Sequence, residues 1–408
     1  MSPTKQKFEF TVLKQGPQAS RLGLLHTPHG MVETPAFIFC ATRGAMKSLT
    51  IEQLRSANTQ IILSNTYHLM LQPGAESVHA QGGLQKFSGW RGPMLTDSGG
   101  FQIFSLGSGN VADEIKGRRL LGQAKTLLKL SEQGASFRSY INGAEYLLTP
   151  EESIRVQRNL GADLIVVLDE CTPYHVDKTY TQESMERSHR WALRSLQEYC
   201  NHDDGTQKLY GIVQGGVYSD LRKQSVDFVN SNQFFGHAVG GSLGASKQQM
   251  YDIVALTMSM LSKDRPVHLL GIGGVEDIFN GVLNGIDTFD CVHPTRIARH
   301  GGALVKPWNR DSQTREYINL RNSQYKLDQN PLEPDCACAT CFNYSRGYMH
   351  HLLKTEATLA HTLLAQHNVF FMNDLMRRIR EALRNDKIIE LRKQWCTVEQ
   401  AHELMATS

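Results

Sequence analysis

The chain has 408 residues, of which 40% are hydrophobic and 20% are charged, and its formal net charge is +3. This composition suits a globular enzyme with a sizeable core, and the length allows one large α/β barrel with an appendage or two to three ordinary domains. Residues 1–14 contain no apolar signal-like region, and no later run approaches the length of a membrane span. These observations argue against a secreted or membrane-spanning protein, so we expect a cytoplasmic one.

Short, continuous apolar runs recur between residues 36 and 290, and polar or glycine-rich residues and a helical segment follow them. Uninterrupted apolar runs are typical of strands that are buried on both faces of a parallel sheet. The predicted strands cover residues 36–39, 61–63, 93–95, 164–168, 209–213, 237–239, 267–272 and 286–289.

Helical segments alternate with these strands. One begins at Pro150, because proline favours a helix start and Glu151 and Glu152 occupy the first turn. The others are expected at residues 183–199, 221–229, 248–261 and 275–283. About eight β-α units predict an α/β protein with a (β/α)8 TIM-like barrel rather than a doubly wound sheet. No G-x-G-x-x-G or Walker loop is present, which weakens the dinucleotide-binding and phosphate-loop alternatives.

Three acidic residues directly follow or close predicted strands: Asp97, Asp169 and Asp290. In a barrel, the carboxyl ends of the strands open towards solvent and carry the reactive groups. A single acid at such a position is more often a helix cap or a loop anchor. Three of them, with Gln214 closing a fourth strand, favour a convergent polar site. Two carboxylates in such a site would serve as nucleophile and as acid/base at an anomeric carbon.

Other residues at the predicted strand ends have simpler interpretations. The glycines at 240–241 and 271–274 are interpreted as turn residues. Cys171 and Cys291 stand beside candidate acids without an obvious histidine partner, so we expect buried, neutral thiols rather than nucleophiles.

Three of the eight cysteines lie within six residues, at positions 336, 338 and 341. In a chain of this length without a secretion signal, the pattern favours one metal site and free thiols over a disulfide framework. Three thiolates at this spacing can wrap one tetrahedral ion and are suited to zinc. The fourth ligand should be His or Cys, and the sequence leaves four histidines open, namely His350, His351, His361 and His367.

The strand–helix alternation ends after Ala303. A polar stretch from Trp308, the cysteine cluster and a predicted helical tail over residues 370–394 follow. We therefore divide the chain into a catalytic barrel domain, residues 1–320, and a zinc-binding subdomain, residues 321–408, whose C-terminal helices pack on the barrel. From Arg296 onward the chain has 16 Lys or Arg against 12 Asp or Glu, an excess that suits either phosphate contacts or a solvated face.

Taken together, the motifs resemble the queuine/archaeosine tRNA-ribosyltransferase family, the tRNA-guanine transglycosylases. The matching strings are SNTYHLMLQPG (64–74), LTDSGGFQ (95–102), LDECTPY (168–174), GIVQGG (211–216), AVGG (238–241), FDCVHPTR (289–296), CACATC (336–341) and QHN (366–368). They cover almost the whole chain, and DECTPY is similar to the bacterial branch. The resemblance implies an irregular (β/α)8 barrel, a zinc subdomain and a homodimer formed through that subdomain.

The resemblance also implies an exchange reaction on RNA. Family members replace guanine at the wobble position of tRNAs with GUN anticodons (the Asp, Asn, His and Tyr isoacceptors) by a free 7-deazaguanine base. A base must leave its stack to be reached, and RNA loops offer unstacked bases. A covalent intermediate retains the energy of the glycosidic bond, so the exchange needs no nucleotide cofactor.

Roles are carried over by matching motif. Asp290 corresponds to the nucleophile that attacks C1′ of the ribose, and Asp97 to the general acid/base. The implied base pocket consists of Phe101, Asp169, Cys171, Gln214, Gly241, Ser242 and Gly244, with Phe101 stacking on the base where many bacterial members have Tyr. Arg296 is expected to contact the RNA.

The implied zinc ligands are Cys336, Cys338, Cys341 and His367. Four protein ligands close the coordination shell, so the Zn²⁺ is expected to be structural.

One segment departs from the bacterial pattern. After AVGG, Gly244 stands where bacterial members have Val, and Ser246 replaces a Glu that supports recognition of the aminomethyl group of preQ1. The missing side chains would make room for a larger substituent, which favours queuine as the incoming base. Drift in a loop that still serves preQ1 is the alternative.

Other functional classes lack their expected features. A metal-dependent barrel hydrolase would need an H-x-H pair near the first strand, and none is present there. A catalytically silent RNA-binding subunit would lack the acid pair Asp97 and Asp290. An archaeosine-type enzyme is expected to carry additional C-terminal RNA-binding domains.

Overall fold

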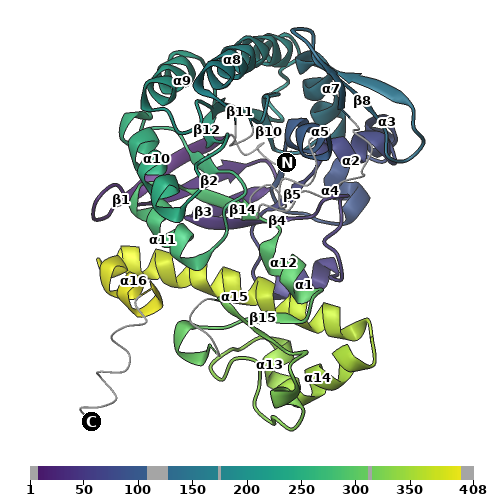
Figure 1. Ribbon diagram of the computed structural model, residues 1–408, viewed down its shortest axis with the longest axis vertical. Coiled ribbons are helices and arrows are strands. Elements are labelled where there is room, and N and C mark those ends of the chain that lie inside the picture. Colours follow the sequence, from purple (N-terminus) through teal and green to yellow (C-terminus); the bar gives the residue numbers. More distant parts are fainter. Residues whose placement is uncertain (1–7, 108–126, 173–175, 311–314, 397–408) are drawn as a thin grey trace, which may run out of the picture.

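The computed structural model describes residues 8–107, 127–172, 176–310 and 315–396. Its centre is a closed barrel of parallel strands in the order β10-β11-β12-β13-β14-β4-β5-β6, with helices around it (Figure 1). Every strand of this barrel coincides with a predicted apolar run, so the (β/α)8 prediction is confirmed.

The strands have the following bounds: β1 (Glu9–Gln15), β2 (Arg21–Thr27), β3 (Gly30–Thr34), β4 (Ala36–Cys40), β5 (Ile62–Ser64), β6 (Met94–Thr96), β7 (Leu127–Leu130), β8 (Ala135–Arg138), β9 (Glu145–Leu148), β10 (Leu164–Val166), β11 (Lys208–Val213), β12 (Gly236–Val239), β13 (Val267–Leu269), β14 (Thr288–Cys291), β15 (Gly302–Leu304) and β16 (Tyr317–Asn319).

The helices have the following bounds: α1 (Ile51–Ser56), α2 (Thr66–Leu71), α3 (Ala75–Ala80), α4 (Gly83–Ser88), α5 (Gly100–Gly107), α7 (Pro150–Leu160), α8 (Lys178–Asn201), α9 (Ser219–Ser231), α10 (Lys247–Met260), α11 (Val275–Leu283), α12 (His293–Ala298), η1 (Pro307–Asn309), η2 (Ser323–Tyr325), α13 (Ala339–Asn343), α14 (Arg346–Lys354), α15 (Leu359–Arg384) and α16 (Ile388–Cys396). All five predicted barrel helices are present, and α11 has the predicted bounds.

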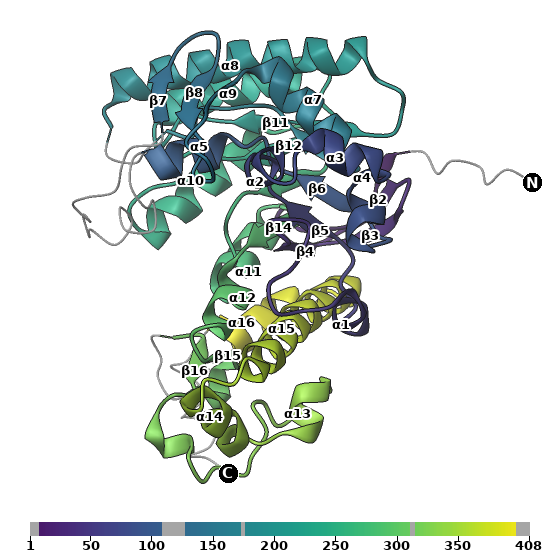
Figure 2. The ribbon, with the colours of Figure 1, turned by 90° about the vertical axis from the view of Figure 1, so that its right-hand side faces the viewer.

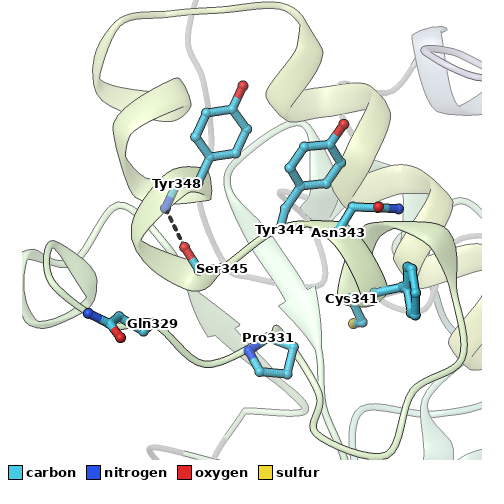
Figure 3. A pocket seen from close by; sticks show the side chains of 8 residues that line it. Gln329, Pro331, Cys341, Asn343, Tyr344, Ser345 and Tyr348 are labelled. Atoms are coloured by element: carbon cyan, nitrogen blue, oxygen red, sulfur yellow. Dashed lines mark hydrogen bonds between the residues drawn. The ribbon is translucent and has the colours of Figure 1, made fainter.

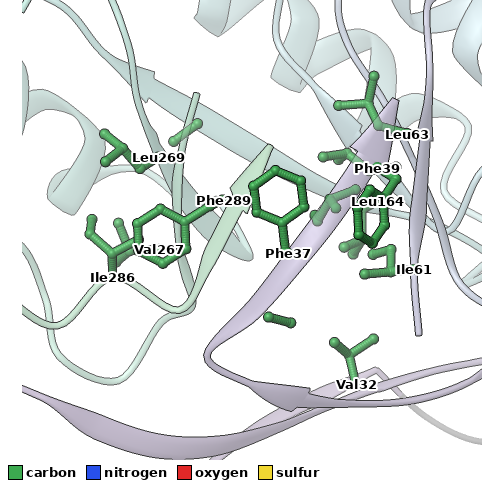
Figure 4. Packing of buried hydrophobic residues seen from close by; sticks show 14 of the residues in the cluster. Val32, Phe37, Phe39, Ile61, Leu63, Leu164, Val267, Leu269, Ile286 and Phe289 are labelled. Atoms are coloured by element: carbon green, nitrogen blue, oxygen red, sulfur yellow. The ribbon is translucent and has the colours of Figure 1, made fainter. Parts of the chain in front are cut away.

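Apolar side chains on both faces of the strands hold the barrel closed. Phe37, Phe39, Leu269 and Phe289 are each at most 2% exposed (Figure 4). Phe289 of β14 pairs in register with Phe37 of β4, which joins the last barrel strand to the first. Burying one such side chain contributes roughly 1.5–3 kcal/mol, so the core fixes the positions of the strand ends.

An antiparallel sheet, β1-β2-β3, packs at the amino ends of the barrel strands. Arg21 donates from Nε and Nη2 to the buried carboxylate of Asp287, which precedes β14, at 2.9 and 2.5 Å. His29 Nδ1 lies 2.7 Å from Oδ1 of Asp163, which precedes β10. This sheet therefore covers the end of the barrel that is opposite to the strand-end acids.

A second antiparallel sheet, β7-β8-β9, lies at the carboxyl ends. Phe137 and Leu148 pack with Tyr67, Ile103 and Trp191 in a hydrophobic cluster of their own. Tyr67 follows β5 and Ile103 follows β6, so this sheet adjoins the mouth of the barrel. Neither three-stranded sheet was among the predicted elements.

The C-terminal part of the chain lies below the barrel in Figures 1 and 2 and has its own hydrophobic cluster. The cluster joins Ala298, Ala303 and Leu320 to Leu352 and Leu364. Since these side chains come from both sides of residue 320, the predicted division at that residue stays a prediction.

The predicted helical tail over residues 370–394 is helical in the structure, but it comprises two helices with other bounds. Helix α15 begins at Leu359 and ends at Arg384, and α16 follows from Ile388. Asp386, with φ of 57°, adopts the left-handed conformation that turns the chain between the two helices. Helix α15 packs on the barrel, where Arg380 Nη1 donates to the carbonyl oxygen of Pro35 at 2.9 Å.

The polar stretch after Trp308 is described in part, because residues 311–314 lie outside the described residues. The ring of Trp308 packs against Trp395 of α16, with centroids 6.0 Å apart. Glu316 Oε1 accepts the backbone N–H of Val275 at the start of α11 at 2.9 Å. The described ends of the stretch thus attach to α16 and to the barrel. Across the described ranges, no helix is both long and apolar enough to span a membrane.

Candidate active site and metal centre

Asp97 follows β6, and the start of α2 holds its carboxylate. The backbone N–H of Thr66 donates to Oδ1 at 2.8 Å, and Gln102 Nε2 donates to Oδ2 at 2.7 Å. Asn65 Nδ2 also donates to Oδ2, and Thr66 Oγ1 donates to the backbone carbonyl of Asp97 at 2.5 Å. These donors fix the orientation of the side chain.

Burial nevertheless raises the pKa of Asp97 to about 6, because desolvation of the charged form outweighs these hydrogen bonds. The charge of Asp290 contributes to the same rise. A carboxyl group with this pKa can hold or release a proton near neutral pH, as a general acid/base must.

Asp169 follows β10 and is 8% exposed. Gln214 Nε2 donates to its Oδ2 at 2.6 Å, and Ser98 Oγ donates to its Oδ1 at 3.3 Å. Burial raises the pKa of Asp169 to about 7. A Cβ at Gly100 would lie 2.6 Å from the carbonyl oxygen of Asp169, so glycine is needed where α5 approaches the end of β10.

Gln214, at the end of β11, is 1% exposed. Its Oε1 is buried and has no hydrogen-bond partner among the described residues. It faces Gly241, where an added Cβ would lie 2.6 Å away. Gln214 and Gly241 therefore lie against each other, and the buried acceptor between them has no partner among the described residues.

A buried arginine connects these two strand ends. Arg222 donates from Nε to the carbonyl oxygen of Gly216 at 2.7 Å and from Nη2 to that of Ser242 at 3.2 Å. Burial lowers its pKa to about 9. Its contacts hold the loops after β11 and β12 in fixed relation.

Asp290 lies within β14, near its carboxyl end, and its side chain is 13% exposed. The backbone N–H of Gly271 donates to Oδ1 at 2.8 Å, and Cys40 Sγ lies 3.7 Å from Oδ2. His268 Nε2 lies 3.2 Å from Oδ1, and His268 Nδ1 forms a 2.9 Å hydrogen bond with Thr288 Oγ1. A Cβ at Gly271 would meet no other heavy atom within 4 Å, so there is open space beside this glycine.

Five of the predicted site residues occupy strand ends on the same side of the barrel, and four of these strands are neighbours. Asp97, Asp169, Gln214, Gly241 and Asp290 lie at the ends of β6, β10, β11, β12 and β14. Phe101 on α5 is 49% exposed and Arg296 on α12 is exposed, whereas Cys171, Ser242 and Gly244 are partly buried. Pro173 and Tyr174 of the LDECTPY string lie outside the described residues.

Sequence reasoning missed several groups around the acids. Asn65 and Thr66 occur in the SNTYHLMLQPG string, in which the sequence indicates no role for them, and the sequence predicts Gly271 only as a turn residue. The φ of 73° at Gly271 fits a turn, but its N–H also contacts Asp290. His268 gave no sequence signal, because its proximity to Asp290 follows from the pairing of β13 with β14. Burial raises the pKa of Cys291 to about 11, in line with the expected neutral thiol.

Cys336, Cys338, Cys341 and His367 form the candidate metal centre, and their ligand atoms all lie within 4.8 Å of one another. His367 Nδ1 is 3.8, 3.6 and 3.3 Å from the three sulfur atoms, in sequence order. Tetrahedral zinc with ordinary bond lengths requires sulfur–nitrogen distances of about 3.5 Å, so this group could hold a metal ion.

The surroundings of the centre fix its histidine. His367 Nε2 hydrogen-bonds to the carbonyl oxygen of Leu304 at 2.8 Å, which leaves Nδ1 free to act as ligand. The backbone N–H of Cys341 donates to Cys338 Sγ at 3.3 Å. His350 instead bonds to the carbonyl oxygen of Leu320 at 2.8 Å, which gives it another role.

The residue after His367 ties the centre to the barrel. Asn368 Nδ2 donates to the carbonyl oxygens of Pro294 and Gly302, at 2.9 and 3.1 Å, and Asn368 Oδ1 accepts from the backbone N–H of Leu304 at 2.8 Å. Since Pro294 is the second residue of α12, the helix that follows Asp290, the metal centre and the active site share one structural support.

The fold and the site define an α/β-barrel enzyme with strand-end carboxylates and, near the C-terminus, a cluster of three cysteines and one histidine that could hold a metal ion. The sequence model of the family described as queuine tRNA-ribosyltransferase matches residues 17–401, and the chain belongs to this family. It is therefore an enzyme of the pentosyltransferase class.

Individual relatives agree with this assignment. A queuine tRNA-ribosyltransferase of Roseiflexus sp. (strain RS-1) is 45% identical over 386 residues, which cover 92% of this chain and 96% of the relative. That of Thermoanaerobacter pseudethanolicus is 43% identical over 92% of this chain and 93% of its own length. That of Protochlamydia amoebophila is 41% identical over 93% of this chain and 96% of its own length.

Proposed function

We propose that this enzyme is a tRNA-guanine transglycosylase. It exchanges guanine at the wobble position of tRNAs with GUN anticodons for a free 7-deazaguanine base, as a step of queuosine modification. The observation that supports this best is the pair of strand-end carboxylates, Asp97 and Asp290, in unlike surroundings. Two carboxyl groups whose environments differ can divide the roles of acid and nucleophile.

In the first displacement, a carboxylate oxygen of Asp290 attacks C1′ of the ribose. The bond between C1′ and N9 of guanine breaks, its electron pair stays on the base, and Asp97 donates a proton to it. The N–H of Gly271 orients the attacking carboxylate, and the raised pKa of Asp97 supplies the proton near neutral pH.

In the second displacement, Asp97 removes the proton from N9 of the incoming deazaguanine, which attacks C1′ while the Asp290 carboxylate departs. The proton count closes, since Asp97 donates one proton and regains one. No water or nucleotide is consumed, in agreement with the lack of a nucleotide-binding motif.

Base recognition is assigned to the pocket at the ends of β10, β11 and β12. The free Oε1 of Gln214 can accept an N–H of the guanine-like edge, and Asp169, with its pKa raised to about 7, can accept or donate. The exposed ring of Phe101 can stack on the base, with Cys171 and Ser242 lining the pocket. Arg296, exposed on α12, is proposed to contact the RNA backbone.

Exchange on defined transcripts tests this function. With labelled guanine, tRNAs with GUN anticodons, that is, the Asp, Asn, His and Tyr isoacceptors, should become labelled. A transcript with adenine at the wobble position should not. Equal labelling of both transcripts, or labelling of neither, would contradict the proposal.

We further propose queuine rather than preQ1 as the incoming base. Ser246 caps α10 by accepting the N–H of Gln249 at 3.2 Å. The position therefore carries no acid that could support recognition of the aminomethyl group of preQ1. The space beside Gly244 contains the side chain of Gln249, whose Oε1 accepts the backbone N–H of Ala245 at 3.0 Å and would lie 2.6 Å from an added Cβ. This side chain can move aside or bond to a polar substituent of the base.

Boronate gels distinguish the two bases, because the cis-diol of queuine retards modified tRNA. Displacement of labelled guanine reports incorporation of either base. We expect retarded RNA with queuine. Displacement of labelled guanine by preQ1, without any retarded RNA after incubation with queuine, would contradict the proposed preference for queuine.

A structural Zn²⁺ is proposed for the candidate metal centre, because three thiolates and one imidazole match that ion and leave no ligand position for substrate. Its ligands would hold the subdomain together, and the hydrogen bond from Asn368 to Pro294 would fix the position of the helix after Asp290.

A homodimer formed through this subdomain is also proposed. Phe342 and Leu327 are 85% and 86% exposed. A groove beside Phe342 is lined by Pro331, Tyr344 and Tyr348 (Figure 3). A second copy of this chain would cover these apolar side chains. Phe342→Asp should shift the mass measured by light scattering from dimer to monomer, whereas Leu13→Asp, at an exposed position of β1 in the N-terminal sheet, should not. A wild-type monomer would contradict the proposal.

A further inference from the structure

A basic and aromatic group of side chains adjoins Asp97 without belonging to the pocket described above. Arg43 Nη2 donates to the hydroxyl oxygen of Tyr140 at 2.8 Å, and its guanidinium carbon lies 5.8 Å from the centre of that ring. His68 Nδ1 and the same hydroxyl are 3.0 Å apart, and the two rings meet edge to face at 5.6 Å. We call Arg43, His68 and Tyr140 the Tyr140 platform.

The platform is connected to Asp97 through helix α2. His68 lies on α2, two residues after Thr66, whose backbone and side chain hold Asp97. The buried Tyr67 between them packs against Tyr140, with centroids 6.0 Å apart and planes tilted by 31°. Tyr140 itself lies in the turn between β8 and β9, at the carboxyl ends of the barrel strands.

The ring of Tyr140 is held in place and yet open to solvent. Two polar partners fix its hydroxyl group, and the side chain is still 42% exposed. A preorganised, exposed ring loses little entropy when a flat ligand stacks on it. A tyrosine with only a structural role would gain more stability from full burial of its ring.

The charge around the ring is positive. Arg43 and Lys47 are both exposed. Burial lowers the pKa of His68 to about 4, and the nearby charges of Arg43 and Lys47 add to the effect. His68 is therefore neutral at pH 7, and the two exposed cations are available to an anion.

We infer that the Tyr140 platform stacks an unpaired nucleotide next to the target base and that Arg43 contacts its phosphate. The inference rests on the proposed function, because it concerns the same RNA. Single-stranded RNA is commonly bound by aromatic rings that stack on bases beside cations that meet phosphates. The link through Thr66 puts the platform beside the residue that protonates the departing guanine, where the neighbouring nucleotide must lie.

The test compares truncations at two adjacent positions of the same turn. Tyr140 and Ile141 are each 42% exposed, so Tyr140→Ala and Ile141→Ala remove side chains of equal exposure, of which only one carries a ring. Tyr140→Phe keeps the ring and loses the hydroxyl. Guanine exchange on an anticodon stem-loop gives the KM for RNA and, separately, the KM for guanine.

We expect Tyr140→Ala to raise the KM for RNA about tenfold, equivalent to about 1.4 kcal/mol, with the KM for guanine unchanged. Tyr140→Phe should stay within about threefold of wild type, and Ile141→Ala within about twofold. Arg43→Gln should reduce the slope of log affinity against log salt by about 0.7 to 0.9, the effect of one lost phosphate contact.

An unchanged KM for RNA in Tyr140→Ala, or the same rise in Ile141→Ala, would overturn the inference. So would a parallel rise in the KM for guanine, which would indicate a disturbed pocket. If Tyr140→Ala does not fold, the salt slope of Arg43→Gln decides, and an unchanged slope would refute the inference. Absence of exchange in the wild type would refute the proposed function itself, whereas normal exchange with a normal KM in Tyr140→Ala refutes only the platform.

Discussion

Formation of the covalent RNA adduct should slow down as the pH rises through about 6. The first displacement requires protonated Asp97, and burial raises the pKa of this residue to about 6. About half of the enzyme carries that proton at pH 6, but only about 1% does at pH 8. If the chemical step is rate-limiting, adduct formation should therefore be about fifty-fold slower at pH 8.

Single turnovers without free base measure this step directly. Labelled stem-loop RNA at saturating enzyme would be mixed at constant ionic strength, quenched in denaturant and resolved on a gel. Asp97→Asn should be slower by roughly 10²–10⁴-fold and lose most of the pH dependence. Asp169, with a pKa raised to about 7, titrates in the same range, so any dependence left in Asp97→Asn is attributed to it. A wild-type rate that is flat or rises between pH 6 and pH 8 would refute the reasoning.

Three further perturbations address separate parts of the site. Gly271→Ala should slow adduct formation about tenfold, because a side chain at φ of 73° adds about 1–2 kcal/mol of strain and so disturbs the N–H that orients Asp290. Gly205→Ala, with φ of 75° in a surface turn, adds similar strain away from the active site and should not slow adduct formation. His268→Phe should slow adduct turnover about tenfold, because it removes the imidazole that lies 3.2 Å from the departing carboxylate of Asp290. His237→Phe replaces another buried barrel histidine and should leave turnover unchanged in the same gel assay. His367→Ala, or metal removal by a chelator, should lower the unfolding temperature by about 10 °C or more in calorimetry. Activity should be lost only as the subdomain unfolds. Loss of activity without any change in the unfolding temperature would contradict a structural role.

The sequence predicted the barrel because its signals are local. Each barrel strand is a short run that is buried on both faces, and the acids follow or close such runs directly. Asp97 and Asp290 could be proposed as a pair because barrel topology brings all strand ends to one face. The bounds of the C-terminal helices could not be predicted from apolar spacing alone, since the turn at Asp386 interrupts a pattern that continues on both sides.

The surroundings of the acids depend on contacts between distant segments. Thr66 reaches Asp97 only because β5 pairs with β6, and His268 reaches Asp290 only because β13 pairs with β14. The sequence left four histidines open as metal ligands. The structure distinguishes His367, whose Nδ1 faces the sulfur atoms, from His350, which bonds to a backbone carbonyl.

Trapping of the RNA–enzyme intermediate tests the central claim most directly. Wild-type enzyme, incubated with a GUN-anticodon stem-loop and denatured, should give an RNA-linked protein band, and excess guanine should discharge it. Asp290→Ala should give no band and no exchange of labelled guanine. Exchange by Asp290→Ala at the wild-type rate, or a band that persists in it, would contradict the assignment of Asp290 as the nucleophile.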